Sequence, residues 1–179
     1  MSDDRDVELV RGCLAGDRRA FEELVGRYQR PIFNAAYRIL HDRDDAKDVS
    51  QTVFLKAYEH LDRFDTNQRF FSWLYRIAIN ESLDVVGGRK RHDAVVDDLV
   101  ADRPGPEESA SRDELDRGLQ SALMAVRVEY RTVIVLKHIM GCSYEEIAVI
   151  LDCPVKTVKS RLFTARQALR DVLVARGMM

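Results

Sequence analysis

Residues 155–176 form a strongly basic segment near the C-terminal end of the chain. They contain six lysine or arginine side chains and one acid. Apolar residues recur there at every third or fourth position, which predicts a helix with one buried side: Val155, Val158, Leu162, Ala165, Leu169 and Val172. The opposite side would present cations, short polar groups and one aromatic ring: Lys156, Lys159, Ser160, Phe163, Thr164, Gln167 and Arg170. Because cations bind phosphates and short polar groups reach base edges in the major groove, this face is suited to DNA recognition.

Phe163 differs from its neighbours on this face, because a large aromatic ring among polar side chains has no core to fill. Two interpretations stay open. The ring contacts DNA, for instance at a thymine methyl group, or it packs on another part of the protein. For the basic face as a whole, the competing interpretation is a solvated helix with no role in nucleic-acid binding.

The residues before this helix predict the elements that position it. Ser143 and Glu146 have the spacing of a capping box, which opens a short helix over residues 144–151. A tight turn follows at 152–154, and Pro154 is tolerated in the first turn of the next helix. Helix, turn and longer basic helix together predict a helix-turn-helix, and their combination favours DNA binding over a merely solvated face.

Charge divides the chain into three zones. Residues 1–92 hold 16 basic and 16 acidic side chains, residues 93–116 hold 2 and 9, and residues 117–179 hold 10 and 5. The middle zone is rich in Asp and Glu, contains the run Pro104-Gly105-Pro106 and cannot bury much apolar surface. We therefore expect a flexible acidic linker at residues 93–112. The predicted domains are therefore residues 1–92 and residues 113–179.

The first zone predicts helices throughout, so the fold class is all-α. Asp17 can cap a long helix whose apolar stripe is Phe21, Leu24, Val25, Tyr28, Ile32, Ala35 and Ile39. The acids at 42–45 suit the start of a second helix, with Ala46, Val49, Val53, Phe54, Ala57 and Leu61 inward. A third helix is expected from Phe70 to about Gly87 and Gly88, with Trp73, Leu74, Ile77 and Ala78 buried.

Several segments resemble the motifs of one protein family. Residues 143–148 (SYEEIA) and 153–162 (CPVKTVKSRL) resemble region 4 of the extracytoplasmic-function sigma factors. Residues 45–58 (DAKDVSQTVFLKAY) resemble region 2.2 of the same family, and residues 70–80 (FFSWLYRIAIN) resemble regions 2.3 and 2.4. The resemblance covers nearly all of the chain except the linker. It implies an alternative sigma factor that binds core RNA polymerase and directs promoter-specific initiation at −35 and −10 elements.

The resemblance also implies roles for individual residues. Docking on the clamp helices of the largest polymerase subunit would fall to Asp44, Lys47, Asp48, Gln51 and Leu55. The −10 element, with a flipped base held by the loop 62–69, would meet Asp65, Asn67, Arg69, Trp73, Arg76, Asn80, Arg89, Lys90 and Arg91. The −35 element would meet Lys156, Thr157, Lys159, Ser160, Arg161, Phe163, Thr164 and Arg166. Trp73 has a second interpretation as a core residue, because it lies on the buried stripe.

The chain departs from the family pattern in four places. Lys47 stands where an acid is usual, and Lys156 replaces a usual Gly in the recognition helix. Thr164 replaces a common Arg, which puts the usual −35 preference in doubt. The sequence 125–127 (AVR) stands in place of the Leu-Pro that commonly precedes region 4.

The family resemblance also implies an anti-sigma partner. It further implies that electrostatic repulsion from nucleic acid would keep the acidic linker off the promoter.

Other classes of function find less support. The four histidines are scattered and no nucleophile–base pair or phosphate loop is present, so we expect neither an enzyme nor a cofactor. His138 and Cys142 could share a helix face, but no further ligands lie near them in the sequence, so we expect no metal. The acidic start and the lack of a long apolar run predict a cytoplasmic protein without membrane insertion.

Two alternatives to a sigma factor keep the predicted fold. A stand-alone helix-turn-helix regulator would bind DNA by itself, commonly as a dimer, and would need a ligand or dimerisation domain where the region 2 motifs stand. A pure protein-binding module that titrates a partner would not need the basic recognition face.

Overall fold

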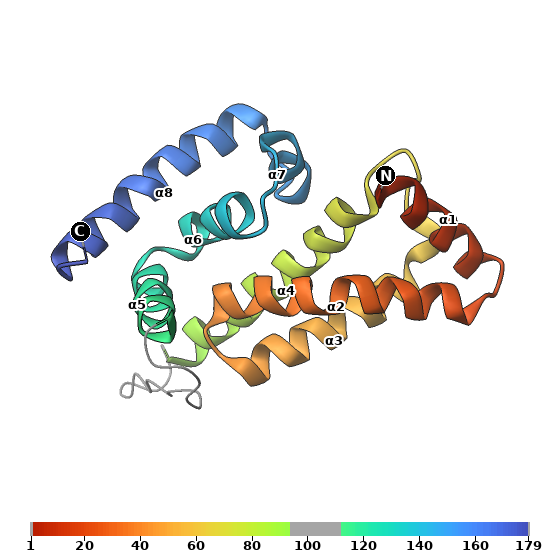
Figure 1. The fold of residues 1–179 in the computed structure, drawn as a ribbon, viewed down its shortest axis with the longest axis horizontal. Helices are drawn as coiled ribbons and strands as arrows, with labels where there is room; N and C mark the ends of the chain where they lie inside the picture. Colours follow the sequence, from red (N-terminus) through yellow and green to blue (C-terminus); the bar gives the residue numbers. More distant parts are fainter. Residues whose placement is uncertain (1, 94–111, 179) are drawn as a thin grey trace.

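The computed structural model describes residues 2–93 and 112–178, and every regular element in these two stretches is helical. This confirms the all-α expectation. The first domain comprises α1 (Ser2–Leu14), α2 (Arg18–Leu40), α3 (Arg43–Glu59), the 3₁₀ turn η1 (Leu61–Arg63) and α4 (Phe70–Asp93). The second comprises α5 (Arg112–Ala125), α6 (Val128–Ile134), the π-helical turn η2 (Val135–Ile139), α7 (Tyr144–Ile150) and α8 (Val155–Ala175). Figure 1 shows the second domain lying along one side of the first.

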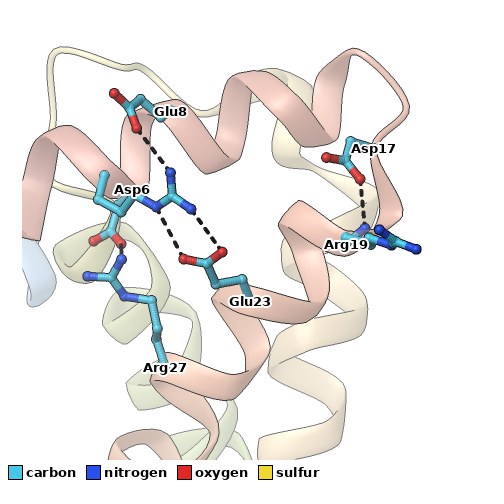
Figure 2. Close-up of polar contacts among 7 residues, drawn as sticks. Asp6, Glu8, Asp17, Arg19, Glu23 and Arg27 are labelled. Carbon is cyan, nitrogen blue, oxygen red and sulfur yellow. Dashed lines mark hydrogen bonds and ion pairs between the residues drawn. The ribbon is translucent and has the colours of Figure 1, made fainter.

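Helix α1 is attached to α2 through a buried acid. Asp6 is 1% exposed, accepts a hydrogen bond from the Tyr28 hydroxyl at 2.5 Å, and lies 3.3 Å from the guanidinium of Arg27. Figure 2 shows Asp6 and Arg27 facing each other, and Asp17 capping the first turn of α2 through the amide of Arg19. The Asp17 cap was predicted, whereas the sequence indicated helix throughout this block without separating α1 from α2.

Helices α2 to α4 build the core of the first domain as the apolar stripes predict. Asp42 caps α3 by accepting from the amides of Asp44 and Asp45. The inward positions of α2, α3 and α4 are almost completely buried, including Leu24, Ile32, Ile39, Ala46, Val49, Val53, Leu74 and Ala78. Trp73 and Ile77 are half-buried, so these two predicted core positions lie at the margin of the core.

Helix α4 does not end at Gly87 and Gly88, where the sequence suggested, but continues to Asp93. Two glycines inside a helix cost about 1 kcal/mol each relative to alanine. The turn that contains them is held from outside, because the Arg89 guanidinium pairs with Asp45 and donates to the Leu40 carbonyl at 3.2 Å. Tertiary contacts of this kind override the local preference and extend the helix.

The second domain contains the predicted helix-turn-helix. Ser143 Oγ accepts from the Glu146 amide at 3.0 Å, and the Glu146 carboxylate accepts from the Ser143 amide at 2.7 Å, which completes the capping box. Asp152 adopts a left-handed backbone, with φ of 49°, in the turn between α7 and α8. On α8, Val158, Leu162 and Ala165 are buried. Leu162 and Ala165 pack in one cluster with Leu123 of α5 and Val133 of α6.

The two domains share one apolar cluster. It joins first-domain residues such as Ile39, Leu74 and Tyr75 to second-domain residues such as Val135, Leu136, Cys142, Ile147 and Ile150. Figure 1 shows α7 beside the first half of α4, and α5 and α6 beside the end of α2. The linker predicted at 93–112 lies almost entirely outside the described residues, which resume at Arg112 in α5.

A buried arginine fastens the second domain to the end of α2. Arg131 is 6% exposed and donates to the carbonyls of Leu123, Met124 and Val126 and, across the interface, of Ile39. Burial lowers the pKa of Arg131 to about 10, so the side chain stays charged at neutral pH. Arg38 adds an ion pair with Asp116 at 2.7 Å and a hydrogen bond to Gln120 at 3.1 Å.

Candidate nucleic-acid interface

Helix α8 presents the predicted polar face to solvent. The side chains of Lys156, Lys159, Ser160, Arg161, Phe163, Thr164 and Arg166 are exposed, and that of Thr157 is half-buried. Phe163 is 66% exposed, so its ring does not pack on another part of the described chain. A large exposed aromatic ring between two cationic turns is available to a partner such as a base edge or a thymine methyl group.

Several side chains on and beside this face are already held in place. The ammonium groups of Lys137 and Lys159 lie 4.7 and 5.7 Å from the centre of the Tyr144 ring. The Thr164 hydroxyl lies 3.3 Å from the Ser160 carbonyl and can donate to it. Arg166 lies 3.4 Å from His138, whose pKa is lowered by partial burial and by the positive charges of Arg166 and Lys137. His138 is therefore neutral at physiological pH and accepts from the arginine.

The residues predicted to dock on the polymerase line the outer side of α3. Asp44, Lys47, Asp48 and Gln51 are exposed, and Leu55 is 64% exposed although it is apolar. Leu55 and Gln51 border a shallow groove of about 470 Å³ between α2 and α3, whose walls include Phe21, Val25, Phe54 and Tyr58. The sequence prediction included Leu55 but not Phe21 or Tyr58, which belong to different helices and meet only in the folded chain.

The residues predicted to read the −10 element occupy different environments. Asn80 is exposed, and Asp65 accepts from the Asn67 amide and side chain in the loop before α4. Trp73 is half-buried and packs against Phe64 and Phe70, with ring centres 5.3 and 5.6 Å away. Arg89 pairs with Asp45, as described for the end of α4. The side chains of Lys90 and Arg91 lie outside the described part of the structure.

Arg69 and Arg76 face the helix-turn-helix of the same chain. Arg69 pairs with Glu146 of α7. Arg76 donates to the Val149 carbonyl at 2.7 and 3.1 Å and to the Asp152 carboxylate at 3.1 Å. The chain therefore brings two predicted −10 residues against the motif predicted to read the −35 element. Nothing in the local sequence indicated these contacts, because the partners are 73 to 77 positions apart.

Comparison with known proteins covers both domains. The family model for sigma-70 region 2 matches residues 24–92, and that for sigma-70 region 4 matches residues 116–169. The RNA polymerase sigma-H factor of Pseudomonas aeruginosa is 37% identical, over 97% of this chain and 96% of its own. The ECF RNA polymerase sigma factor SigW of Bacillus subtilis is 38% identical, over 88% of this chain and 91% of its own.

This chain belongs to the ECF sigma factors.

Solved structures agree with the assignment of this chain to the sigma factor family. CnrH, determined in complex with the cytosolic domain of CnrY, is 33% identical, has a TM-score of 0.74, and aligns over 96% of this chain and 98% of its own. The sigma factor RpoE of Bartonella quintana, in complex with the anti-sigma factor NepR, is 27% identical, has a TM-score of 0.70, and aligns over 86% and 96%. As an alternative sigma factor, the chain directs promoter-specific transcription. Its relatives are sigma factors, which assist transcription and are not enzymes.

The remaining chemical groups of this sigma factor fit structural roles. Cys142 is 2% exposed, and burial raises the pKa of its thiol to about 12, so it packs as a neutral side chain. His138 is exposed and Cys142 is buried, and no group of three or more potential metal ligands occurs in residues 2–93 and 112–178. None of the helices in those ranges is long and apolar enough to cross a membrane.

Proposed function

We propose that this sigma factor docks on the clamp helices of the largest polymerase subunit through the outer side of α3. Asp44, Lys47, Asp48, Gln51 and Leu55 would supply the contacts. The support is that this face combines exposed charges with an exposed leucine beside an apolar groove. A polar rim around an apolar centre is the composition expected of a protein interface.

Promoter reading is proposed for two separate faces. The −35 element would enter the α8 face, where the observation that carries the proposal is the two-thirds exposed ring of Phe163 among exposed cations. Lys159, Ser160 and Phe163 would meet base edges, while Lys156 would meet a phosphate. The −10 strand would contact the loop 62–69 and the first half of α4, with Asn80 and the basic segment 89–91 further along its path.

Anti-sigma control in the cytoplasm completes the proposal. The similar structures of CnrH and RpoE are named as complexes, with the cytosolic domain of CnrY and with the anti-sigma factor NepR. A partner of that kind would hold this sigma factor inactive by covering its domains. Pull-down from the source cell before and after stress tests this point: a partner protein should be recovered before stress, and recovery of core polymerase alone would contradict it.

The central experiment is run-off transcription with purified core polymerase and this chain on a genomic fragment library. Sequencing of the 5′ ends should reveal one −35 and one −10 consensus at a fixed separation. Core polymerase without the chain is the control. Absence of any chain-dependent start site would contradict the proposed function.

The second candidate is a stand-alone regulator, because the helix-turn-helix is complete by itself. It would bind its duplex site tightly without polymerase and as a symmetric dimer. The sigma factor should bind duplex promoter weakly when free, with steep loss of affinity as salt rises. Duplex binding by the free chain at physiological salt separates the two.

A further inference from the structure

Two buried phenylalanines lie at the ends of residues 65–69, the part of the loop 62–69 that carries predicted −10 contacts. Phe64 follows the turn η1 and Phe70 begins α4, and they are 6% and 2% exposed. Their rings meet edge to face with centres 5.5 Å apart, and both rings contact Trp73. The placement of the loop therefore depends on what holds this phenylalanine pair.

Tyr28 of α2 is a further ring against this pair. It is buried, and its ring centre lies 5.7 Å from that of Phe70. The Tyr28 hydroxyl donates to the carboxylate of Asp6 in α1 at 2.5 Å. Because the tyrosine ring is rigid, a hydrogen bond at its hydroxyl end also restrains the part of the ring that Phe70 contacts.

Asp6 is a buried carboxylate, and a buried charge is costly unless it is paired and hydrogen-bonded. Its Oδ1 atom lies 3.3 Å from Nη1 of Arg27, and Figure 2 shows the two groups facing each other. The neighbouring apolar residues of α1, Leu9 and Val10, are also buried, but apolar packing has no direction. The polar contacts of Asp6 depend on direction, so they restrict where α1 can lie on α2.

Helix α1 contacts η1 and α4, the elements on either side of the loop, as well as α2 (Figure 1). We propose that Asp6 and Tyr28 are positioning residues for −10 recognition, because their hydrogen bond holds the phenylalanine pair and thereby the loop that meets the DNA strand. Both side chains are buried, so they act through the rings and not by touching DNA. This inference rests on the proposed function, since it concerns the same loop.

The test uses the full chain with Tyr28→Phe, which removes the hydroxyl and keeps the ring. Asp6→Asn is the second variant, because it keeps the size of the side chain and removes its charge. Glu23→Gln is the control for charge, since it removes a 3.0 Å ion pair with Arg5 at the exposed edge of the same two helices. Val10→Ala is the control for stability, because it truncates a fully buried side chain of α1.

The first measurement is the fluorescence of Trp73, the one tryptophan of the sequence, in the free chain. Tyr28→Phe and Asp6→Asn should shift its emission to longer wavelength, because a loosened phenylalanine pair leaves the indole more accessible to water. Glu23→Gln and Val10→Ala should keep the natural emission, even though Val10→Ala melts at a lower temperature. Circular dichroism identifies a temperature at which all four variants are folded, and the spectra are compared there.

The second measurement is binding of the complex with core polymerase to a single-stranded oligonucleotide that carries the −10 sequence from the run-off start sites, by fluorescence anisotropy. Tyr28→Phe and Asp6→Asn should each bind about three- to tenfold more weakly, as expected for loss of a buried hydrogen bond to a charged group. The double variant should bind no more weakly than the weaker single variant, because both changes act through one hydrogen bond. Glu23→Gln should stay within about twofold of the natural chain, because its ion pair is exposed.

A positioning role requires both the shift in emission and the loss of affinity, and either result alone would overturn it. An equal loss of affinity in Val10→Ala would also overturn it, because lower stability would then be the cause. Failure of the proposed function is a separate result, in which the natural chain gives no chain-dependent start site with core polymerase. If start sites appear and Tyr28→Phe behaves like the natural chain, the positioning role fails while the function stands.

Discussion

Helix α8 and the first half of α4 both carry cations suited to DNA, yet they differ in what they contact. On α8 the side chains of Lys156, Arg161 and Phe163 are exposed. On α4 and the loop before it, the guanidinium groups of Arg76 and Arg69 are engaged by the second domain. The contrast is therefore between an α8 face that is exposed to solvent and an α4 face that is partly covered by the second domain.

The largest expected difference in stability is between variants of two adjacent residues of α8. Leu162 is 1% exposed, so Leu162→Ala should lower the free energy of unfolding by about 2–5 kcal/mol through the cavity it leaves. Phe163→Ala should change it by less than about 0.5 kcal/mol, because the ring is largely in solvent. Urea denaturation of both variants measures this, and similar losses would mean that Phe163 packs on protein in solution.

The next largest effect concerns base reading by the same helix. Phe163→Ala or Lys159→Ala should cost the complete polymerase complex about 1–3 kcal/mol on its preferred −35 sequence and relax base choice at one position. A promoter library selected with each variant measures the preference. An unchanged base preference in Phe163→Ala would assign the ring to another partner and not to the promoter.

A third prediction concerns α3, whose outer face is exposed like that of α8 but carries acids and an apolar residue. Asp48→Ala with Gln51→Ala should weaken binding to core polymerase about tenfold, or roughly 1.4 kcal/mol, since a few interface residues dominate affinity. Both side chains lie outside the core, so the melting temperature should stay the same. Unchanged core affinity, or a collapsed fold, would remove these residues from the docking surface.

The smallest expected effect separates phosphate contacts from base contacts on α8. Lys156 is exposed in its first turn, so Lys156→Ala should weaken all promoters alike and reduce the slope of log affinity against log salt by about one. Lys159→Ala is the comparison, because it should also change base preference. A sequence-dependent loss in Lys156→Ala would mean that this lysine reaches a base.

Features set by near neighbours in the chain could be predicted from the sequence. The Asp17 and Asp42 caps, the capping box of Ser143 and Glu146, and the buried stripe of α8 all depend on residues within a few positions of each other. Spacing and hydrogen-bonding capacity are sufficient to identify such features. The exposed face of α8 follows from the same periodicity.

Features set by distant residues could not be predicted in this way. Nothing near Arg131 in the sequence distinguishes it from an exposed cation. In the structure it is buried and donates to the carbonyl of Ile39, 92 positions earlier. The extension of α4 through Gly87 and Gly88 depends on the ion pair between Arg89 and Asp45, which are 44 positions apart. The engagement of Arg69 and Arg76 has the same origin, because no local pattern specifies which surface a second domain will cover.

The separation of Arg69 from Glu146 along the chain also bears on how the protein is made. The ribosome adds about 5–20 residues per second, and N-terminal domains generally fold first. The 77 residues between these partners then take about 4–15 s to synthesise. During that time the nascent first domain carries Arg69 without the acid that engages it in the finished chain. Each new molecule therefore passes through an interval on the ribosome in which this cationic surface is open to nearby RNA or to polymerase.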